Sequence, residues 1–335
     1  MDHNQRLSHL TSGELAYLWN TYEYETMVRC GFTIFLQHVD DEATKELLKE
    51  TQTISTERIE QVKDILMEEK CPPPLGFTES DMNVNAPRLF SDNLYLEFML
   101  QLIKMELPNY GLAFVEVTKP YLQRFYEKAI KDSMNIEKKV KQLAIDKGIY
   151  IPSPRIPTPK QRDIVTKDSF LSGWFGEKRP LLGLEISHLV FNAKRNGIGQ
   201  AVITGFSQVA QAKEVRKFFE RGREISGKTV EIFANILHDH YLPTSTMLWT
   251  SEVTDSTEAP FSDKLMMKMI TTLIASGMSS YGSAMSMSAR RDLGTKYARL
   301  LTEVAQFADD GVEIIIKHGW MEQPPIAADR KDLAK

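Results

Sequence analysis

The feature that most constrains the fold is an internal repeat with a constant offset. A Tyr-Gly pair occurs at Tyr110 and again at Tyr281 (281 minus 110 is 171), and the triplet Phe-Ser-Asp at Phe90 recurs at Phe261. The same register, without a gap, also pairs Glu14 with Glu185, Leu18 with Leu189, Glu60 with Glu231, Pro72 with Pro243 and Tyr126 with Tyr297. Solenoid repeats span about 20–50 residues, so each unit here is expected to be a whole domain.

The duplication divides the 335 residues into a first domain, 1–150, a linker, 151–182, and a second domain, 183–335. Four prolines between positions 152 and 159 open the linker and favour an extended, non-helical path. Three aromatic residues follow later in it, and a purely flexible connection would not need them. We expect this part, with Phe170, Trp174 and Phe175, to pack on a domain surface.

Each unit is predicted to hold four helices and no strand. Apolar residues recur at three- and four-residue steps, and no segment shows sustained two-residue alternation. Thr11 and Glu14 have the spacing of a capping box, Ser91 is a suitable N-cap, and helix four is expected from Pro120 to a C-cap near Gly148. Helices two and three are joined by roughly 20 residues, enough to cross a bundle. Two short hairpins with one long crossover predict an all-α protein of two tandem ferritin-like four-helix bundles.

The repeated Tyr-Gly pair falls in the middle of helix three. Pro108 is expected to break or kink that helix in the first unit, and Gly277 is a weak helical point in the second. Such a bend would either wrap the helix around the core or mark a buried site beside Tyr110 and Tyr281.

A ferritin-like fold suggests a di-iron centre, whose ligands should be recognisable in the sequence. That centre takes a Glu from each of two helices and a Glu-x-x-His motif from each of the other two. Helix two carries Glu60 and Glu231, but Lys63 and Ala234 stand three residues further on. A standard di-iron oxidase is therefore not expected, and the protein is more readily explained as a non-enzyme.

One other group of residues could hold a single divalent metal in the second unit. Glu185 and His188 lie one turn apart at the start of helix one, while His238 and His240 lie at the end of helix two. An antiparallel hairpin would bring these ends together, and Glu with His is a donor set for zinc or a similar ion. The alternative is that the histidines only cap a helix C-terminus, and this alternative is preferred.

Helix three of the second unit is rich in methionine and small residues. Its methionines, which are Met266, Met267, Met269, Met278, Met285 and Met287, favour adaptable core packing over a copper site. The small residues of 275–289 are the best candidate for an interface between the domains or between chains.

Composition narrows the partners and the compartment. The net charge is -4 without a strongly basic block, which argues against nucleic-acid binding. No window approaches the roughly 18 apolar residues of a membrane span. Cys30 and Cys71 form no metal-type pair, which suits a reducing cytoplasm.

The stretches LTSGELAYLW, GWFGEKRPL and EISHL, together with the Tyr-Gly pair in helix three, resemble a bacterial family known as domain of unknown function 3231, found mostly in spore-forming bacilli. The resemblance implies a ferritin-like fold, and some members are labelled as similar to a spore-coat protein. It implies no catalytic residues.

The sequence is compatible with two functions. The first is a structural or interaction protein, associated with sporulation or the spore coat, in which the two repeats pack as an intramolecular pseudo-twofold pair and bind a protein partner or self-associate. The second is a metal-binding or oxidative protein with an atypical mononuclear site in the second repeat.

Overall fold

The repeat is visible in the helices themselves. The computed structural model describes residues 9–174, 178–244, 249–331 and 333–334. The first repeat contains α2 (Ser12–His38), α3 (Glu42–Glu68), α4 (Asp92–Glu116) and α5 (Pro120–Asp146), and the second contains α6 (Gly183–Val209), α7 (Lys213–His238), α8 (Asp263–Met287) and α9 (Arg291–Lys317). Each helix of the second repeat starts 171 residues after its counterpart, since 183 minus 12, 213 minus 42, 263 minus 92 and 291 minus 120 all give 171.

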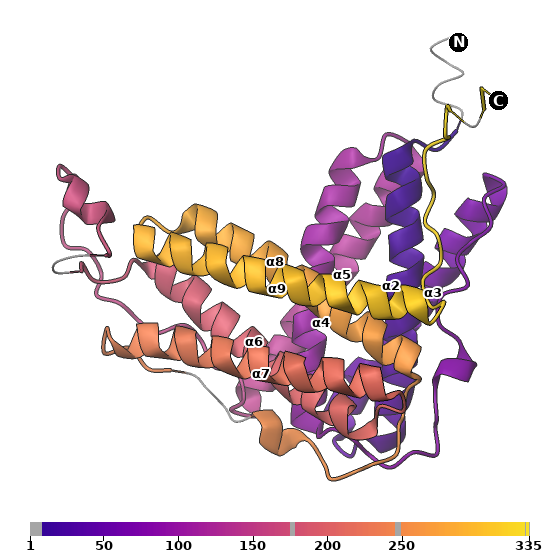
Figure 1. Ribbon diagram of the computed structural model, residues 1–335, viewed down its shortest axis with the longest axis horizontal. Helices are drawn as coiled ribbons and strands as arrows, with labels where there is room; N and C mark the ends of the chain where they lie inside the picture. The colour runs from indigo at the N-terminus through magenta and orange to yellow at the C-terminus, as the bar shows by residue number, and fades with distance from the viewer. Residues whose placement is uncertain (1–8, 175–177, 245–248, 332, 335) are drawn as a thin grey trace.

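The topology is two helical hairpins joined by a long crossover, once in each repeat. Helices α2 and α3 pair, as do α4 and α5, and the same holds for α6 with α7 and α8 with α9. Among the described residues, the crossovers hold only short 3-10 turns, η1 (Glu79–Asp81) and η3 (Trp249–Glu252), and another turn, η2 (Asp168–Leu171), lies in the linker. The described residues form no strand, so the all-α, two-bundle prediction is confirmed. Figure 1 shows the two bundles crossing steeply, with α2 to α5 upright and α6 to α9 nearly horizontal.

The predicted caps are present at the predicted residues. Thr11 and Glu14 form the capping box of α2, and the Ser91 side chain accepts a hydrogen bond from the Leu94 amide at the start of α4. Pro120 occupies the first turn of α5, and Gly148, just past its end, has a φ of 71°, which favours glycine. Local sequence therefore determines where these helices begin and end.

Pro108 does not break helix three. It lies inside α4, which continues to Glu116, so the predicted break is absent. A proline removes one intrahelical hydrogen bond and clashes with the preceding turn. Here α4 is buried over most of its length, with Leu94, Leu100 and Leu102 each no more than 3% exposed, and this burial outweighs the local cost.

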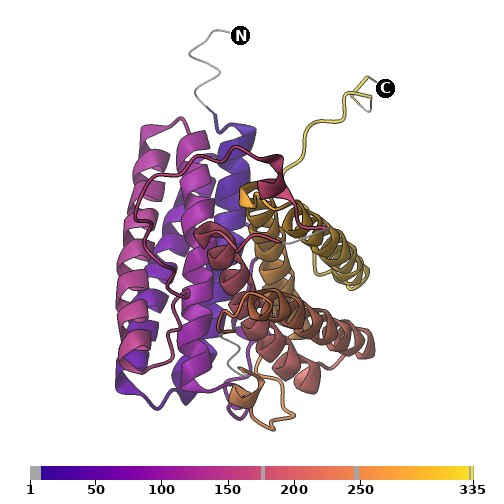
Figure 2. The same cartoon turned by 90° about the vertical axis from the view of Figure 1, so that its left-hand side faces the viewer.

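The two repeats pack against each other through a pseudo-twofold contact. The crossover residue Met82 forms an isolated bridge with Phe261, and Val253 forms the equivalent bridge with Phe90. The neighbouring hydrogen bonds also come in related pairs: the Ser262 amide donates to the Asp81 carbonyl at 2.9 Å, and the Ser91 amide donates to the Glu252 carbonyl at 3.0 Å. Since 252 minus 81 and 262 minus 91 both give 171, the predicted internal packing of the repeats is confirmed. Figure 2 shows the second bundle set against one side of the first.

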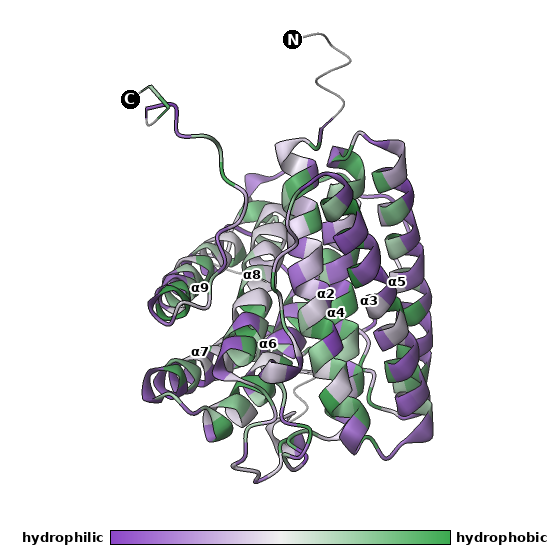
Figure 3. Ribbon diagram, turned by 90° about the vertical axis from the view of Figure 1, so that its right-hand side faces the viewer, coloured by the Kyte–Doolittle hydropathy of each residue, from purple (hydrophilic) through white to green (hydrophobic). Residues whose placement is uncertain are grey.

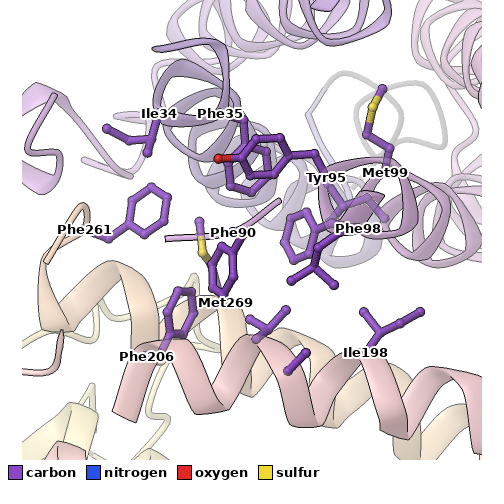
Figure 4. Packing of buried hydrophobic residues seen from close by; sticks show 14 of the residues in the cluster. Ile34, Phe35, Phe90, Tyr95, Phe98, Met99, Ile198, Phe206, Phe261 and Met269 are labelled. Carbon is purple, nitrogen blue, oxygen red and sulfur yellow. The ribbon is translucent and has the colours of Figure 1, made fainter. Parts of the chain in front are cut away.

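A continuous apolar core joins the bundles behind these bridges. Figure 4 shows Phe35, Phe90 and Tyr95 of the first repeat facing Phe206 and Met269 of the second. The cluster is fully buried: Tyr95 is 1% exposed, Phe206 1% and Met269 3%. In Figure 3 the apolar colour lies mainly toward the helix contacts, and the outward side of α5 is largely hydrophilic.

The methionine-rich helix α8 divides into two parts. Met266, Met267 and Met269 are buried in the core between the bundles, as expected for adaptable packing. Met285 and Met287, at its other end, are 38% and 53% exposed.

The linker is exposed over most of its proline-rich part. Its later residues approach the second bundle, where Gly173 is buried against Asp292 and the Arg179 guanidinium lies 4.3 Å from the Phe170 ring centroid. Trp174 is 55% exposed. Phe175, also expected to pack, lies outside the described residues.

Candidate functional site

A charged cluster lies at the centre of the first bundle, and each helix contributes one residue to it. These residues are Glu25 from α2, Arg58 from α3, Glu106 from α4 and Ser133 from α5, and their exposures are 1%, 5%, 6% and 2%. Charged groups are rarely buried so completely unless they are paired. The cluster therefore departs from the apolar core that a helix bundle usually has.

The Arg58 guanidinium lies between the two carboxylates. Its Nη1 donates to Glu25 Oε1 at 2.9 Å and lies 3.5 Å from Glu106 Oε2. Its Nη2 donates to the Ala129 carbonyl at 2.9 Å and to Ser133 Oγ at 3.2 Å. Ser133 in turn donates to Glu106 Oε2 at 2.6 Å, so the cation ties all four helices together.

Two tyrosines complete the cluster. The Tyr110 hydroxyl donates to Glu25 Oε1, and the Tyr24 hydroxyl donates to Glu106 Oε1 at 3.2 Å. Burial, together with the nearby carboxylates, raises the pKa of both phenols well above its usual value, so both remain donors. Tyr110 belongs to the repeated Tyr-Gly pair, so this pair marks a buried polar site in the first repeat.

Burial also controls the protonation of the charged members. It raises the pKa of Glu106 above its usual value of 4.5, and the charge of Glu25 adds to this while Arg58 opposes it. Burial acts against the positive charge of Arg58, yet its acidic neighbours hold its pKa above the ordinary value. One cation therefore stabilises two carboxylates that would otherwise repel each other.

A cavity of about 370 Å³ opens next to the cluster, between the bundles. Tyr24, Glu106 and Tyr110 form its inner wall, and Glu23 of α2 and Lys268 of α8 lie on its lining. The central charges therefore adjoin a space to which both repeats contribute.

The second bundle has replaced every charged member of the cluster. Adding 171 to positions 25, 58, 106 and 133 gives Asn196, Thr229, Gly277 and Val304. Of the two tyrosines, only Tyr110 is retained, as Tyr281, whose hydroxyl donates to Asn196 Oδ1 at 3.0 Å.

An arginine from a different helix enters the second centre. Arg195 of α6 donates to the Leu273 carbonyl at 2.9 Å, and its Nη2 would lie 1.9 Å from a Cβ atom added at Gly277. A side chain at position 277 would therefore displace the Arg195 guanidinium. Gly277, the predicted weak point of helix three, leaves room for this arginine.

The central residues do not fit a di-metal centre. Such a centre needs four carboxylates and two histidines directed inward from the four helices. The first bundle supplies two carboxylates, Glu25 and Glu106, with a permanent cation between them, and the second supplies no carboxylate at the equivalent positions. A guanidinium cannot be a metal ligand, and its charge repels a cation.

Glu185, a predicted metal ligand, is held by other partners. Its two carboxylate oxygens accept from the Arg179 guanidinium at 2.8 and 2.9 Å, and the backbone amides of Leu182 and Arg290 donate to it at 2.9 and 3.1 Å. Glu14 does the same in the first repeat, where it accepts from the backbone amides of Thr11, Thr118 and Lys119. Since 185 minus 14 and 290 minus 119 both give 171, this glutamate ties the start of helix one to the start of helix four in both repeats.

The predicted histidines lie at one end of the second bundle but have separate surroundings. His240 Nε2 lies 2.8 Å from Arg290 Nη1, and burial followed by that positive charge lowers its pKa. His188 Nε2 lies 3.4 Å from Met287 Sδ, and His238 ends α7 at an exposed position. Within 9–174, 178–244, 249–331 and 333–334, no three His, Cys, Asp or Glu side chains are grouped to hold a metal. The four-residue metal site stays a prediction.

Sequence reasoning missed the central cluster, although a signal was present. Glu25 lies three residues after Tyr22 and three before Val28, on the apolar face of its helix. Arg58 lies four residues after Ile54 and four before Val62 in the same way. A charged residue in phase with an apolar stripe predicts a buried pair, provided that another helix supplies the opposite charge.

Fold and site together define an all-helical protein of two fused four-helix bundles with a buried ion-pair cluster in the first. The chain belongs to the family described as "Protein of unknown function (DUF3231)", whose sequence profile matches residues 1–161 and again 169–333. No curated protein matches the chain. A crystal structure named "putative spore coat protein", from Bacillus halodurans, is similar with 14% identity and a TM-score of 0.39, over 45% of this chain and 98% of that one. None of the described helices is long and apolar enough to cross a membrane.

Proposed function

We propose that the protein is a structural or interaction protein whose fused bundles need no resident metal. The observation that supports this most directly is the Arg58 guanidinium between Glu25 and Glu106, at the place where a ferritin-like bundle would bind its metals. The cation offsets part of the charge of the two carboxylates, and the hydrogen bonds of the cluster join four helices. This chemistry suits a fixed scaffold better than redox turnover.

Metal analysis of the untagged protein, purified without chelator and after incubation with iron, manganese, zinc or copper, tests the proposal. We expect less than about 0.1 equivalent of any of them per chain, because a bound metal needs deprotonated ligands free of other partners. A stoichiometric metal that is lost in the Glu25→Gln/Glu106→Gln variant would place a metal in the first bundle and overturn the proposal.

The same measurement tests the alternative site in the second repeat. One metal per chain that is lost in His240→Ala or His188→Ala, but kept in Glu25→Gln/Glu106→Gln, would establish a mononuclear site at the end of that bundle. His9→Ala is the matched control, because this histidine precedes α2 and belongs to neither group.

The association with sporulation is a separate part of the proposal and comes from the family resemblance alone. It is tested by quantifying the chain in purified spores and in vegetative cells of its own host. Enrichment in spores supports the association, and equal abundance in both removes it without affecting the metal-free scaffold.

A further inference from the structure

Among the described residues, two ion pairs cross the contact between the repeats, and they are related by the pseudo-twofold axis. Lys194 Nζ of α6 lies 2.6 Å from Glu97 Oε1 of α4, and Lys268 Nζ of α8 lies 2.6 Å from Glu23 Oε2 of α2. The positions correspond, because 194 minus 23 and 268 minus 97 both give 171. In each pair, helix one of one repeat meets helix three of the other.

The charges at these equivalent positions are opposite. The first repeat carries a glutamate at both, Glu23 and Glu97, and the second carries a lysine at both, Lys194 and Lys268. If two first repeats packed with this geometry, Glu23 of each would face Glu97 of the other. If two second repeats did so, lysine would face lysine.

Several of the other contacts between the repeats use the same residue types in both directions. Phe35 and Phe206 are equivalent positions with the same residue, and so are Phe90 and Phe261. The crossover contacts are equivalent as well: an acidic residue of one crossover, Asp81 or Glu252, faces the N-cap serine of the other repeat. An apolar and acid-to-serine contact of this kind would accept two copies of either repeat.

Burial makes the charges decisive. The Glu97 side chain is 0% exposed and that of Lys194 is 8%, while those of Glu23 and Lys268 are 17% and 33% exposed. Like charges brought together at an interface are strongly unfavourable, and oppositely charged positions select partners in the same way in coiled coils.

We propose that these exchanged charges make the two repeats obligate, mutually specific partners: a first repeat accepts a second repeat and rejects another first repeat, and the reverse. The surface of each repeat that packs against the other repeat can therefore bind only a repeat of the other kind. Two chains can associate through this surface only if the first repeat of one chain packs on the second repeat of the other. Any other self-association uses the outer surfaces of the bundles.

The test keeps the full chain until it has folded. A protease site is inserted between Lys160 and Gln161, in an exposed part of the linker, and the folded protein is cut there. A second protein carries the same site with all four charges exchanged, E23K/E97K/K194E/K268E. The two cut proteins, one isotope-labelled, are mixed in denaturant, refolded together and analysed by native mass spectrometry.

We expect each first half to recover its own charge-matched second half, with mismatched pairs and pairs of identical halves at least about a hundredfold rarer. Mismatched pairs at the statistical level, or pairs of two identical first halves, would overturn the proposal. A wild-type first half paired with an exchanged first half would support it, because the charges of these two halves are complementary.

If the halves do not refold, a double-mutant cycle of charge reversals in the uncut chain tests the proposal instead. Glu23→Lys and Lys268→Glu are each expected to lower the urea midpoint, and the double exchange is expected to recover most of the loss. This pair is the better choice, because Lys104 lies near the other one and its pKa is lowered to about 8 by burial and then by Lys194. A double variant no better than the sum of the single ones would contradict the proposal. The uncharged control Glu23→Gln/Lys268→Gln shows how much of the loss comes from packing alone.

Discussion

Replacing Arg58 by methionine tests whether the central cluster holds the first bundle together. The change keeps much of the side-chain volume but leaves Glu25 and Glu106 without their cation, and removes the donor to Ser133 and to the Ala129 carbonyl. Breaking a buried ion pair by removing one partner costs about 3–5 kcal/mol. Domains of this kind are stable by about 5–15 kcal/mol, so the loss would be a large fraction of the total.

The loss should depend on pH in a defined direction. The pKa of Glu106 in the folded protein is raised above the value of 4.5 expected in the unfolded chain. Protonated Glu106 therefore contributes fully to stability below about pH 4.5, and this contribution is lost as the pH rises through the folded-state pKa. Without Arg58 that pKa rises further, because the opposing positive charge is gone. The variant should therefore lie closest to the wild type near pH 5 and furthest from it near pH 7.5.

Urea unfolding followed by circular dichroism measures both quantities, using the transition of the first bundle where the two bundles unfold separately. A loss below about 1 kcal/mol near pH 7.5, or an equal loss at both pH values, would refute the reasoning. The triple variant E25Q/R58M/E106Q removes the charges as well and should recover most of the stability, since a neutral set replaces an unpaired one. Thr229→Val is the matched control, because it changes the equivalent position of the second bundle, where no ion pair exists among the described residues.

Three further predictions follow from the structure. A thiol reagent should modify the half-buried Cys71 well before Cys30, whose pKa burial raises to about 11, and a time course of thiol titration shows the order. Asp92→Asn and Asp263→Asn should each lose about 1–2 kcal/mol in urea unfolding, because each carboxylate accepts two backbone amides at the turn between helices one and two of its repeat. Asp92→Asn should lose the more of the two, since Asp92 also forms an ion pair with Arg88. Burial alone would raise the pKa of Glu185, but its paired arginine and the backbone amides lower it. The stability that this carboxylate provides is therefore present above about pH 4.5 and is lost as the pH falls through the lowered pKa. Thermal melts should accordingly show Glu185→Gln approaching the wild type in acid.

The sequence predicted the helices well because their signals are local and doubled. Thr11, Ser91 and Pro120 are suitable residues at helix starts in their own right, and the repeat allows each boundary to be checked against its counterpart. Of the break or kink predicted at Pro108, the break is absent, because the tertiary burial of α4 outweighs a local preference.

The site was less predictable because it depends on which helices face each other. Arg58 interrupts an apolar stripe, and a periodicity analysis records such a residue as an exception. Its meaning appears only when Glu25 and Glu106 are placed opposite it by packing. Glu185 and His240 were correctly placed at one end of the second bundle, but Arg290, which contacts both, stands 50 residues beyond His240. No spacing rule connects them.

The repeated tyrosine shows how a fused duplication can diverge. Tyr110 and Tyr281 keep the same position and direction, yet one meets a carboxylate in an ionic cluster and the other meets the neutral amide of Asn196. In a homodimer of identical units, any change at the centre or at the contact appears twice and must suit both copies. Fusion removes that constraint. Glutamates in one repeat can then be matched by lysines in the other, and one bundle can keep a buried cation from helix two while the other takes Arg195 from helix one. The helices of the two repeats keep the constant sequence offset, whereas the charged residues at the bundle centres and at the contact have diverged.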